Sequence, residues 1–384
     1  MNTNNIGVIG IGKLGLSFAL LAEHCGYDVF GCDTCSQYVE SLYDGTFRST
    51  EPFIEDYLKS ATKFAASTDT QIVVQDCNIL FCFVATPSLP DGSYDHSAID
   101  RVVADLQELH VRGMDMSSKV LVIGCTTMPG YCDTVQERLE STGISVVYNP
   151  EFIAQGSIIQ GLRFADMVLI GTDNPTASDV LAKLYDRIMD ITPRFNIMSR
   201  KAAELTKISI NCYLTMKIGY ANMIGEIAIN SGCETEVNTI LTAIGDDSRI
   251  GHKCLRYGFG YGGPCLPRDM KALGVHAGRT GTQAVIPKAI DVTNNLHANY
   301  LFRDCIANNT DNLPFLFTQL TYKPGTDMLV ESQQYRLCKD LLEAGYSVDI
   351  TESPAVLAQV QLELAMYEER VTYGQVTNGY KIEL

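Results

Sequence analysis

Residues 6–15 read IGVIGIGKLG. Three of them, Gly10, Gly12 and Gly15, follow a G-x-G-x-x-G spacing between an apolar, strand-like run and a helical pattern that closes at Gly26. In such a unit the first glycine permits the tight turn, the second lets the backbone approach a pyrophosphate, and the third allows close helix–strand packing. The stretch therefore predicts a Rossmann-type dinucleotide-binding fold, with phosphates at the N-terminus of the helix.

The residue that indicates the cofactor is Asp33, which ends a second apolar run, YDVFGCD, 23 positions after Gly10. A carboxylate at this place accepts hydrogen bonds from the adenosine ribose hydroxyls. Residues 34–37 contain no arginine to hold a 2′-phosphate, so NAD is favoured over NADP. The alternative is a turn without a ligand, in which Asp33 caps the next helix. Position, spacing and context together favour NAD.

The order of elements predicts an α/β protein that begins with a doubly wound parallel sheet covered on both faces. Helical periodicity over residues 201–231 predicts one long helix, and residues 315–350 begin another α/β unit. The last 30 residues have no clear pattern. We therefore expect three domains: a Rossmann domain (1–199), a central long-helix domain (200–308) and a shortened C-terminal α/β domain (309–384). The strands expected in the first half are 6–10, 28–32, 78–84, 119–123, 145–147 and 167–170.

Composition excludes several classes of protein. The 384 residues include 45 acidic and 29 basic ones, and a net charge of −16 argues against a nucleic-acid or anionic-membrane surface. The polar start MNTNN indicates no signal peptide, and no apolar run approaches the ~20 residues of a membrane span. The 13 cysteines lack zinc spacing, because Cys32 and Cys35 have no second pair. These features predict a cytoplasmic protein without a metal site, whose thiols are mostly buried and reduced.

One cysteine stands apart from the apolar strand and helix patterns. Residues 258–269 read GFGYGGPCLPRD and place Cys265 among glycines and prolines, just before a predicted helix. A helix N-terminus favours the thiolate, so Cys265 is a candidate nucleophile. Asp269, four residues later, could face the same site. From local composition alone, an inert loop thiol is an equal alternative.

Two further polar groups lie where a site could form. Lys207 and Asn211 are spaced i, i+4 on the long helix, flanked by apolar residues, so they either form a solvated stripe or point into a site. The segment Asn149–Phe152 follows a predicted strand and thus lies near the carboxyl edge of the sheet, where doubly wound folds bind ligands. Its alternative is a plain turn with an exposed Glu151.

Together these motifs resemble the UDP-glucose/GDP-mannose dehydrogenase family. The resemblance covers residues 6 to about 350 and rests on several motifs in the correct order. They are the dinucleotide fingerprint, VATP (84–87), NPEF (149–152), ELTKISIN (204–211), RIG (249–251), the cysteine loop, LTYKPGTD (320–327) and ES (331–332).

The resemblance implies oxidation of the C6 alcohol of a nucleotide sugar to the acid, most readily UDP-glucose to UDP-glucuronate, a polysaccharide precursor, by a homodimer. The implied catalytic residues are Cys265, Lys207, Asn211, Asp269 and Glu151. The implied cofactor-binding residues are Gly10, Gly12, Lys13, Leu14, Gly15, Asp33, Thr86, Thr126 and Arg268. The implied substrate-binding residues are Phe152, Gln155, Lys207, Asn211, Arg249 (from a partner subunit), Tyr261, Gly262 and Lys323.

The implied chemistry suits these residue types. A first hydride transfer yields an aldehyde, which the Cys265 thiolate captures as a thiohemiacetal. A second hydride transfer to a second NAD gives a thioester that water cleaves. Lys207 and Asn211 can stabilise charge on the reacting oxygen, while Glu151 or Asp269 can take a proton from water.

The chain departs from the family pattern at three places. Gln155 stands where the family usually has a second glutamate, and Val330 stands where an arginine usually precedes Glu331; Arg268, in place of the usual lysine, could compensate for that lost cation. The C-terminal domain is also short, and the family's later strands have no clear counterpart after Ile350. Two alternatives therefore stay open: a two-electron hydroxyacid dehydrogenase, which needs no cysteine, and a non-catalytic nucleotide-binding protein.

Overall fold

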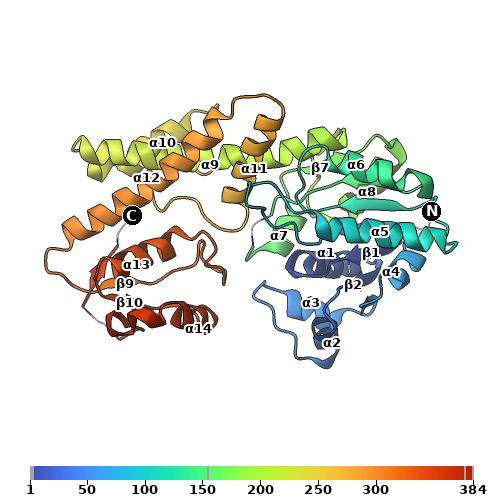
Figure 1. Cartoon of the computed structure of the whole chain (residues 1–384), viewed down its shortest axis with the longest axis horizontal. Helices are drawn as coiled ribbons and strands as arrows, with labels where there is room; N and C mark the ends of the chain where they lie inside the picture. Colours follow the sequence, from blue (N-terminus) through green and yellow to red (C-terminus); the bar gives the residue numbers. More distant parts are fainter. Residues whose placement is uncertain (1–3, 154, 376–377, 383–384) are drawn as a thin grey trace. The chain divides into compact units, whose positions relative to one another are not determined.

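The computed structural model describes residues 4–153, 155–375 and 378–382, and the polar start of the chain at residues 1–3 lies outside this set. The chain forms two compact units, Met1–Ile208 and Ser209–Leu384 (Figure 1). The boundary between them falls inside the long helix α9 (Arg200–Asn230), which confirms the helix expected at residues 201–231. The division into three domains stays a prediction.

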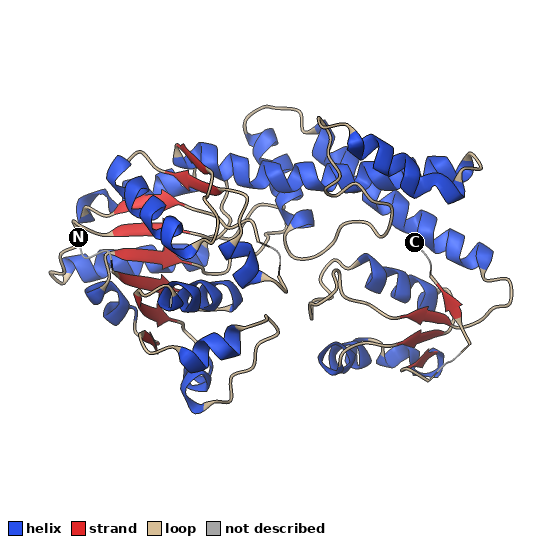
Figure 2. Cartoon of the chain, turned by 180° about the vertical axis from the view of Figure 1, so that it is seen from behind, coloured by secondary structure: helices blue, strands red, loops and turns tan. Residues whose placement is uncertain are grey.

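The first unit contains an eight-stranded sheet in the order β3-β2-β1-β4-β5-β6-β7-β8, a Rossmann-type arrangement (Figure 2). Neighbouring strands are parallel, except that β6 and β7 are antiparallel and paired only at Tyr148 and Gly171. The strands are β1 (Asn5–Ile9), β2 (Asp28–Cys32), β3 (Phe64–Ser67), β4 (Ile79–Cys82), β5 (Val120–Ile123), β6 (Ser145–Tyr148), β7 (Val168–Gly171) and β8 (Phe195–Met198).

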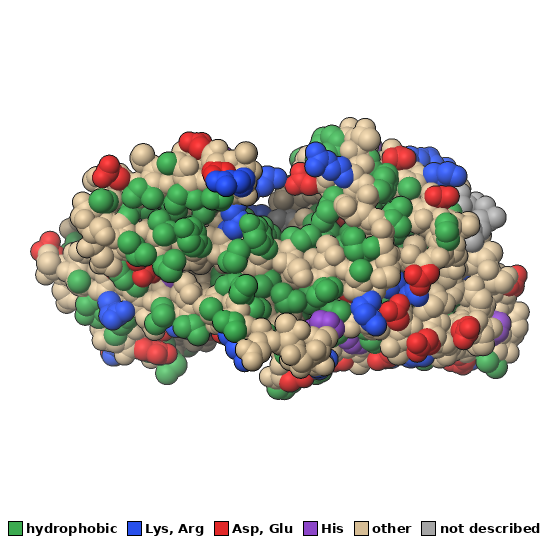
Figure 3. Space-filling view, turned by 90° about the horizontal axis from the view of Figure 1, so that it is seen from above, with side chains coloured by type: hydrophobic (Ala, Val, Ile, Leu, Met, Phe, Trp, Pro, Cys, Tyr) green, Lys and Arg blue, Asp and Glu red, His purple; other side chains and the backbone are tan. Residues whose placement is uncertain are grey.

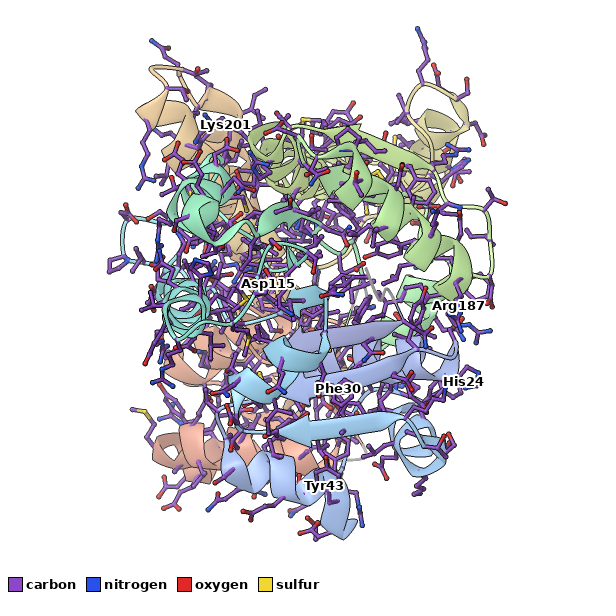
Figure 4. All side chains as sticks on the ribbon, turned by 90° about the vertical axis from the view of Figure 1, so that its right-hand side faces the viewer. His24, Phe30, Tyr43, Asp115, Arg187 and Lys201 are labelled. Atoms are coloured by element: carbon purple, nitrogen blue, oxygen red, sulfur yellow. The ribbon has the colours of Figure 1, made fainter. Side chains whose placement is uncertain are left out.

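Helices cover both faces of this sheet, and each face has its own apolar core. Because strand side chains alternate, Val8 and Phe81 pack into one core while Ile9 and Leu80 pack into the other. The helices are α1 (Lys13–His24), α2 (Ser36–Asp44), α3 (Ile54–Ser60), α4 (Thr70–Asp76), α5 (Ser97–Val111), α6 (Tyr131–Leu139), α7 (Ile158–Arg163) and α8 (Pro175–Ile188). Figure 4 places His24 and Arg187, from the last turns of α1 and α8, on the same side of this unit.

The sheet differs from the sequence prediction in two respects. Strands β3 and β8 were not expected, since both are edge strands with few fully buried side chains and so have no continuous apolar run. The second is one antiparallel pair, β6–β7, in a sheet whose other neighbouring strands are parallel as expected.

The second unit joins a helical part to a small parallel sheet in the order β11-β10-β9-β12. Its helices are the remainder of α9, α10 (Val237–Asp246), α11 (Leu266–Arg279), α12 (Val285–Asn308), α13 (Gln333–Glu343) and α14 (Pro354–Glu363). Two short 3₁₀ segments, Glu234–Glu236 and Ala365–Arg370, precede α10 and follow α14. The strands are β9 (Phe315–Phe317), β10 (Val348–Ile350), β11 (Val371–Thr372) and β12 (Tyr380–Lys381).

The segment after Ile350, where the sequence shows no clear pattern, contains two strands. Strands β11 and β12 complete the small sheet, but each has only two residues, which is too short for the alternation that identifies a strand in a sequence. Within the described ranges, none of the helices is long and apolar enough to cross a membrane.

Candidate active site

The three glycines of the first loop each have a distinct structural role. Gly10 has φ +86°, and a Cβ there would lie 2.7 Å from the Phe83 carbonyl oxygen. A Cβ on Gly15 would lie 2.0 Å from the Gly10 oxygen, so α1 packs directly on the turn. A Cβ on Gly12 would meet no described atom within 4 Å. The loop thus has an open backbone position at the N-terminus of α1, which fits a pyrophosphate.

These roles predict opposite outcomes for two alanine variants. Gly12→Ala should leave the melting temperature unchanged but weaken NAD binding by about tenfold or more, because the methyl group fills the open position. Gly15→Ala should instead lower the melting temperature, since its methyl group meets the loop backbone. Calorimetric titration with NAD and thermal unfolding of both variants make the comparison. Equal NAD affinity in Gly12→Ala and wild type would contradict the assignment.

The other predicted cofactor residues follow the carboxyl ends of neighbouring strands. Asp33 follows β2, and its Oδ1 accepts a hydrogen bond from the Cys35 N–H at 3.1 Å, which shapes the turn into α2. Thr86 is buried after β4, and Thr126 is half-buried after β5, the strand paired with β4. The carboxyl edge of a doubly wound sheet is where dinucleotides bind. Individual contacts of Lys13, Leu14, Thr86 and Thr126 with NAD stay predictions.

Glu151 lies after β6 and forms a compact group with α8 and α9. The Lys207 ammonium donates to the Glu151 backbone oxygen at 2.7 Å and lies 4.6 Å from the centre of the Phe152 ring. The Tyr185 hydroxyl lies 2.8 Å from Glu151 Oε1. Burial raises the pKa of the Glu151 carboxyl to about 7, against the opposing effects of Tyr185 and the Lys207 charge. A carboxyl with this pKa can act as a base near neutral pH.

Lys207 is not part of a solvated stripe. Its side chain is buried, as is that of Asn211 one turn later on α9. The structure therefore excludes the solvated-stripe interpretation for both residues, and Glu151 is held by neighbouring side chains rather than exposed in a plain turn.

Two buried glutamates that sequence reasoning missed hold the loops of the first unit. Glu204 of α9 accepts hydrogen bonds from the Thr127 hydroxyl at 2.7 Å and from the Cys132 N–H at 2.9 Å, beside Thr126. Glu51 accepts from the N–H groups of Gly156 and Ile158, at 2.6 and 3.1 Å, and so fixes the segment that carries Gln155. Glu204 stands inside a motif already quoted, whereas nothing in the sequence around Glu51 indicated its role.

In the second unit, Cys265 is exposed and forms the N-cap of α11. The fully buried Asp269 lies one turn along, and its Oδ2 accepts a hydrogen bond from the Asn211 amide at 2.6 Å. Arg268 Nε lies 3.5 Å from Asp269 Oδ1. The structure thus brings together Cys265, Asp269, Asn211 and Arg268. A contact of Arg268 with the cofactor stays a prediction.

The sequence pattern singled out Cys265 among the cysteines. In the structure it is one of three exposed thiols, with Cys35 and Cys254, while seven of the 13 cysteines are buried. Cys254 lies in an irregular loop with φ +61°.

Three buried polar side chains hold the glycine-rich loop before Cys265. Asn222 of α9 accepts from the Gly258 N–H at 3.1 Å, and His297 of α12 lies 2.7 Å from the Gly258 oxygen through Nε2. Asn294 of α12 bonds both the N–H and the carbonyl oxygen of Tyr261, at 3.0 and 3.1 Å. A Cβ on Gly260 would lie 2.2 Å from the Asn294 side-chain oxygen, so glycine is required there. Sequence reasoning found the loop but not these three residues.

The segment before α13 packs against the glycine-rich loop that precedes Cys265. The Gly263 N–H donates to the Val330 oxygen at 3.0 Å, and a Cβ on Gly262 would lie 2.2 Å from the Glu331 oxygen. A pocket of about 660 Å³ lies beside this segment and is lined by residues of α11, α12 and α13 together with Tyr261. The ES motif and the cysteine loop, 66 positions apart, therefore belong to one structure.

The contacts described for Arg249 and Lys323 are with residues close to them in the sequence. The Arg249 side chain is 86% exposed and is paired with the Asp247 carboxylate at 2.6 Å. The Lys323 backbone oxygen accepts from the hydroxyls of Thr321 and Thr326. Their roles toward substrate stay predictions, as do those of Phe152, Gln155, Tyr261 and Gly262. No cluster of His, Cys, Asp and Glu within the described ranges could hold a metal ion.

Comparison with known proteins identifies the family of the chain. Residues 4–189 match the NAD binding domain of the UDP-glucose/GDP-mannose dehydrogenase family, and residues 201–296 match its central domain. The chain belongs to this family. The predicted family, the α/β fold and NAD as the cofactor are thereby confirmed. Members of this family are oxidoreductases that act on nucleotide sugars.

Three relatives illustrate the similarity. The chain is 29% identical over 385 residues to a UDP-glucose 6-dehydrogenase of Pseudomonas aeruginosa, covering 96% of this chain and 82% of that protein. It resembles the solved structure of a UDP-glucose dehydrogenase from Pyrobaculum islandicum with a TM-score of 0.86 and 27% identity, covering 97% and 86% of the two chains. A UDP-D-ManNAc dehydrogenase from Pyrococcus horikoshii gives a TM-score of 0.77 at 21% identity, covering 96% and 93%, which concerns the fold alone.

Proposed function

We propose that the protein is a cytoplasmic UDP-glucose 6-dehydrogenase that converts UDP-glucose to UDP-glucuronate and reduces two molecules of NAD. The observation that carries the proposal is the start of α11, where the exposed Cys265 precedes the buried Asp269, itself bonded to Asn211. An N-terminal helix position stabilises a thiolate, and a fixed carboxylate–amide pair can orient a reacting oxygen. UDP-glucose is preferred because the relatives at 27% and 29% identity carry that name.

NAD would lie against the loop of Gly10, Gly12 and Gly15, with Asp33 on its ribose, and it would supply hydride acceptance at both oxidations. The chain's own groups perform the remaining steps. The Cys265 thiolate adds to the aldehyde carbon, and the resulting oxyanion is stabilised by Lys207 and Asn211. After the second oxidation, water attacks the thioester carbon, Glu151 takes a proton from that water, and the C–S bond breaks to return the thiolate.

The proposal is tested with NAD and a panel of UDP- and GDP-sugars, by following NADH absorbance and the mass of the product. We expect two NADH per UDP-glucose and a product heavier by the change from alcohol to acid. One NADH per sugar would favour a two-electron dehydrogenase. Tight binding of NAD and UDP-sugar without any NADH would favour a non-catalytic protein. A preference for another sugar would refute only the choice of glucose as the sugar.

We also propose that α9 forms a homodimer interface. Its part in the second unit exposes Tyr213, Tyr220, Met223 and Ile227, with spacings of seven, three and four residues that place them on one face. Figure 3 looks onto the side of the molecule where α9 lies in Figure 1 and shows many hydrophobic side chains there. An apolar helical stripe of this kind is typical of a contact between protein chains.

The dimer is tested by one charged substitution in this stripe. Ile227→Asp should convert a dimer to a monomer in sedimentation velocity, because it places a carboxylate in an apolar contact. Val111→Asp is the matched control, since Val111 is 84% exposed and lies on α5 instead. A wild-type protein that sediments as a monomer would exclude the interface.

A further inference from the structure

Tyr185 connects two acceptors with one hydroxyl group. Its oxygen lies 2.6 Å from Asn149 Oδ1 and 2.8 Å from Glu151 Oε1. The Asn149 amide group donates to the Leu169 carbonyl oxygen at 2.9 Å, which fixes the asparagine so that its own oxygen faces Tyr185. Asn149 and Tyr185 are both buried. The three side chains therefore form one row, Asn149–Tyr185–Glu151, in the first unit.

A tyrosine hydroxyl carries one proton, so it donates to only one of these two acceptors at a time. When Glu151 is protonated, it donates to the Tyr185 oxygen, Tyr185 donates to Asn149, and every group in the row is satisfied. When Glu151 is ionised, the hydroxyl must turn to the carboxylate, and two oxygens 2.6 Å apart are left without a proton between them. The protonation state of Glu151 and the direction of the Tyr185 hydroxyl are therefore coupled.

The electrostatic surroundings place this exchange near neutral pH. Two titratable groups of the described residues act on Glu151: Tyr185 from α8 and Lys207 from α9. Burial raises the pKa of the carboxyl to about 7, while the tyrosine bond and the lysine charge lower it. Burial and the adjacent carboxylate raise the pKa of Tyr185 well above its usual range, so the phenol keeps its proton.

We propose that Tyr185 is a positioning residue for hydrolysis of the thioester: its hydroxyl turns from Asn149 to Glu151 when Glu151 ionises, and turns back when Glu151 takes a proton from water. The proposal rests on the hydrolytic role assigned to Glu151 above. The step balances, because the water proton moves to the carboxylate while the remaining hydroxide forms the new C–O bond.

The first test removes the hydroxyl group. In Tyr185→Phe the ionised carboxylate of Glu151 loses its charge-assisted donor. The acidic limb of the pH profile of thioester hydrolysis should therefore move to higher pH by about one unit. Hydrolysis at pH 7 should fall by about fivefold and recover at pH 9. The readout is decay of the covalent Cys265 adduct, followed by rapid quench and mass spectrometry, with KM for both substrates unchanged. Tyr131→Phe is the matched control, since that hydroxyl bonds the Asp100 carboxylate on α5.

The second test removes the competing acceptor. Asn149→Leu has nearly the same volume but frees the hydroxyl to donate to Glu151, so the acidic limb should move down, opposite to Tyr185→Phe. Thermal unfolding and NAD titration identify a variant that fails to fold. A uniform loss of rate at every pH, or a shift in the same direction in both variants, would overturn the proposal.

An infrared measurement separates this proposal from the assigned activity. The carbonyl band of a protonated carboxyl should titrate with a midpoint near pH 7 in wild type. The band should be absent in Glu151→Gln, and its midpoint should move to higher pH in Tyr185→Phe. If no sugar is oxidised but the band shifts as expected, the hydroxyl exchange stands and the proposed function fails. An unchanged titration midpoint in Tyr185→Phe refutes the exchange, whatever the enzyme oxidises.

Discussion

Cys265→Ser should lower the rate of UDP-glucuronate formation by about 10³-fold or more. A serine hydroxyl is a far weaker nucleophile than a thiolate at neutral pH, so the aldehyde is not captured and the second oxidation has no substrate. The fold should be preserved, because Cys265 is the exposed N-cap of α11 and serine is among the residues preferred at that position. The measurements are NADH produced per sugar, and mass spectrometry of enzyme quenched during turnover.

Cys254→Ser provides the matched control for this variant. Cys254 is also an exposed thiol in an irregular loop of the second unit, and it has no assigned role. It should retain two NADH per sugar and the covalent adduct at Cys265. Two NADH per sugar from Cys265→Ser would show that the second oxidation does not need the sulfur, and the proposed thiohemiacetal route would be wrong.

The features that the sequence predicted correctly lie in short, contiguous motifs. The nucleotide loop and the cysteine loop each lie within about a dozen residues, so spacing alone identified the turn, the helix start and the residues around them. The i, i+4 spacing of Lys207 and Asn211 was also readable, because a helix fixes which residues share a face. Burial decided between the two interpretations of that pair, and burial comes only from the fold.

What the sequence could not provide was pairing between distant residues. Glu51 and Gly156 are 105 positions apart, and a glutamate in an irregular segment gives no local sign that its carboxylate fixes another loop. Tyr185 lies within an ordinary amphipathic helix, where the tyrosine reads as a core residue rather than as a partner of Glu151. His297 and Asn294 likewise sit in a long helix whose polar residues have no distinctive spacing.

Lys207→Met should lower kcat/KM by about 10²–10³-fold with little change in the folded structure. Methionine retains the apolar stem that packs near Phe152 but removes the ammonium that bonds the Glu151 backbone oxygen. We expect most of the loss in kcat, since the charge is needed as the reacting oxygen becomes an anion. Removal of the ammonium should also raise the pKa of Glu151 further, because the Lys207 charge lowers it.

That second effect gives Lys207→Met a signature that simple misfolding would not produce. An acid whose pKa rises is ionised only at higher pH, so the acidic limb of the hydrolysis profile should move upward as in Tyr185→Phe. Unlike that variant, Lys207→Met should not recover at pH 9, because oxyanion stabilisation is lost at every pH. Lys201→Met, an exposed lysine of the same helix, is the control and should match wild type. Full recovery of Lys207→Met at high pH would mean that Lys207 acts only through Glu151, and the assigned contact with the reacting oxygen would be wrong.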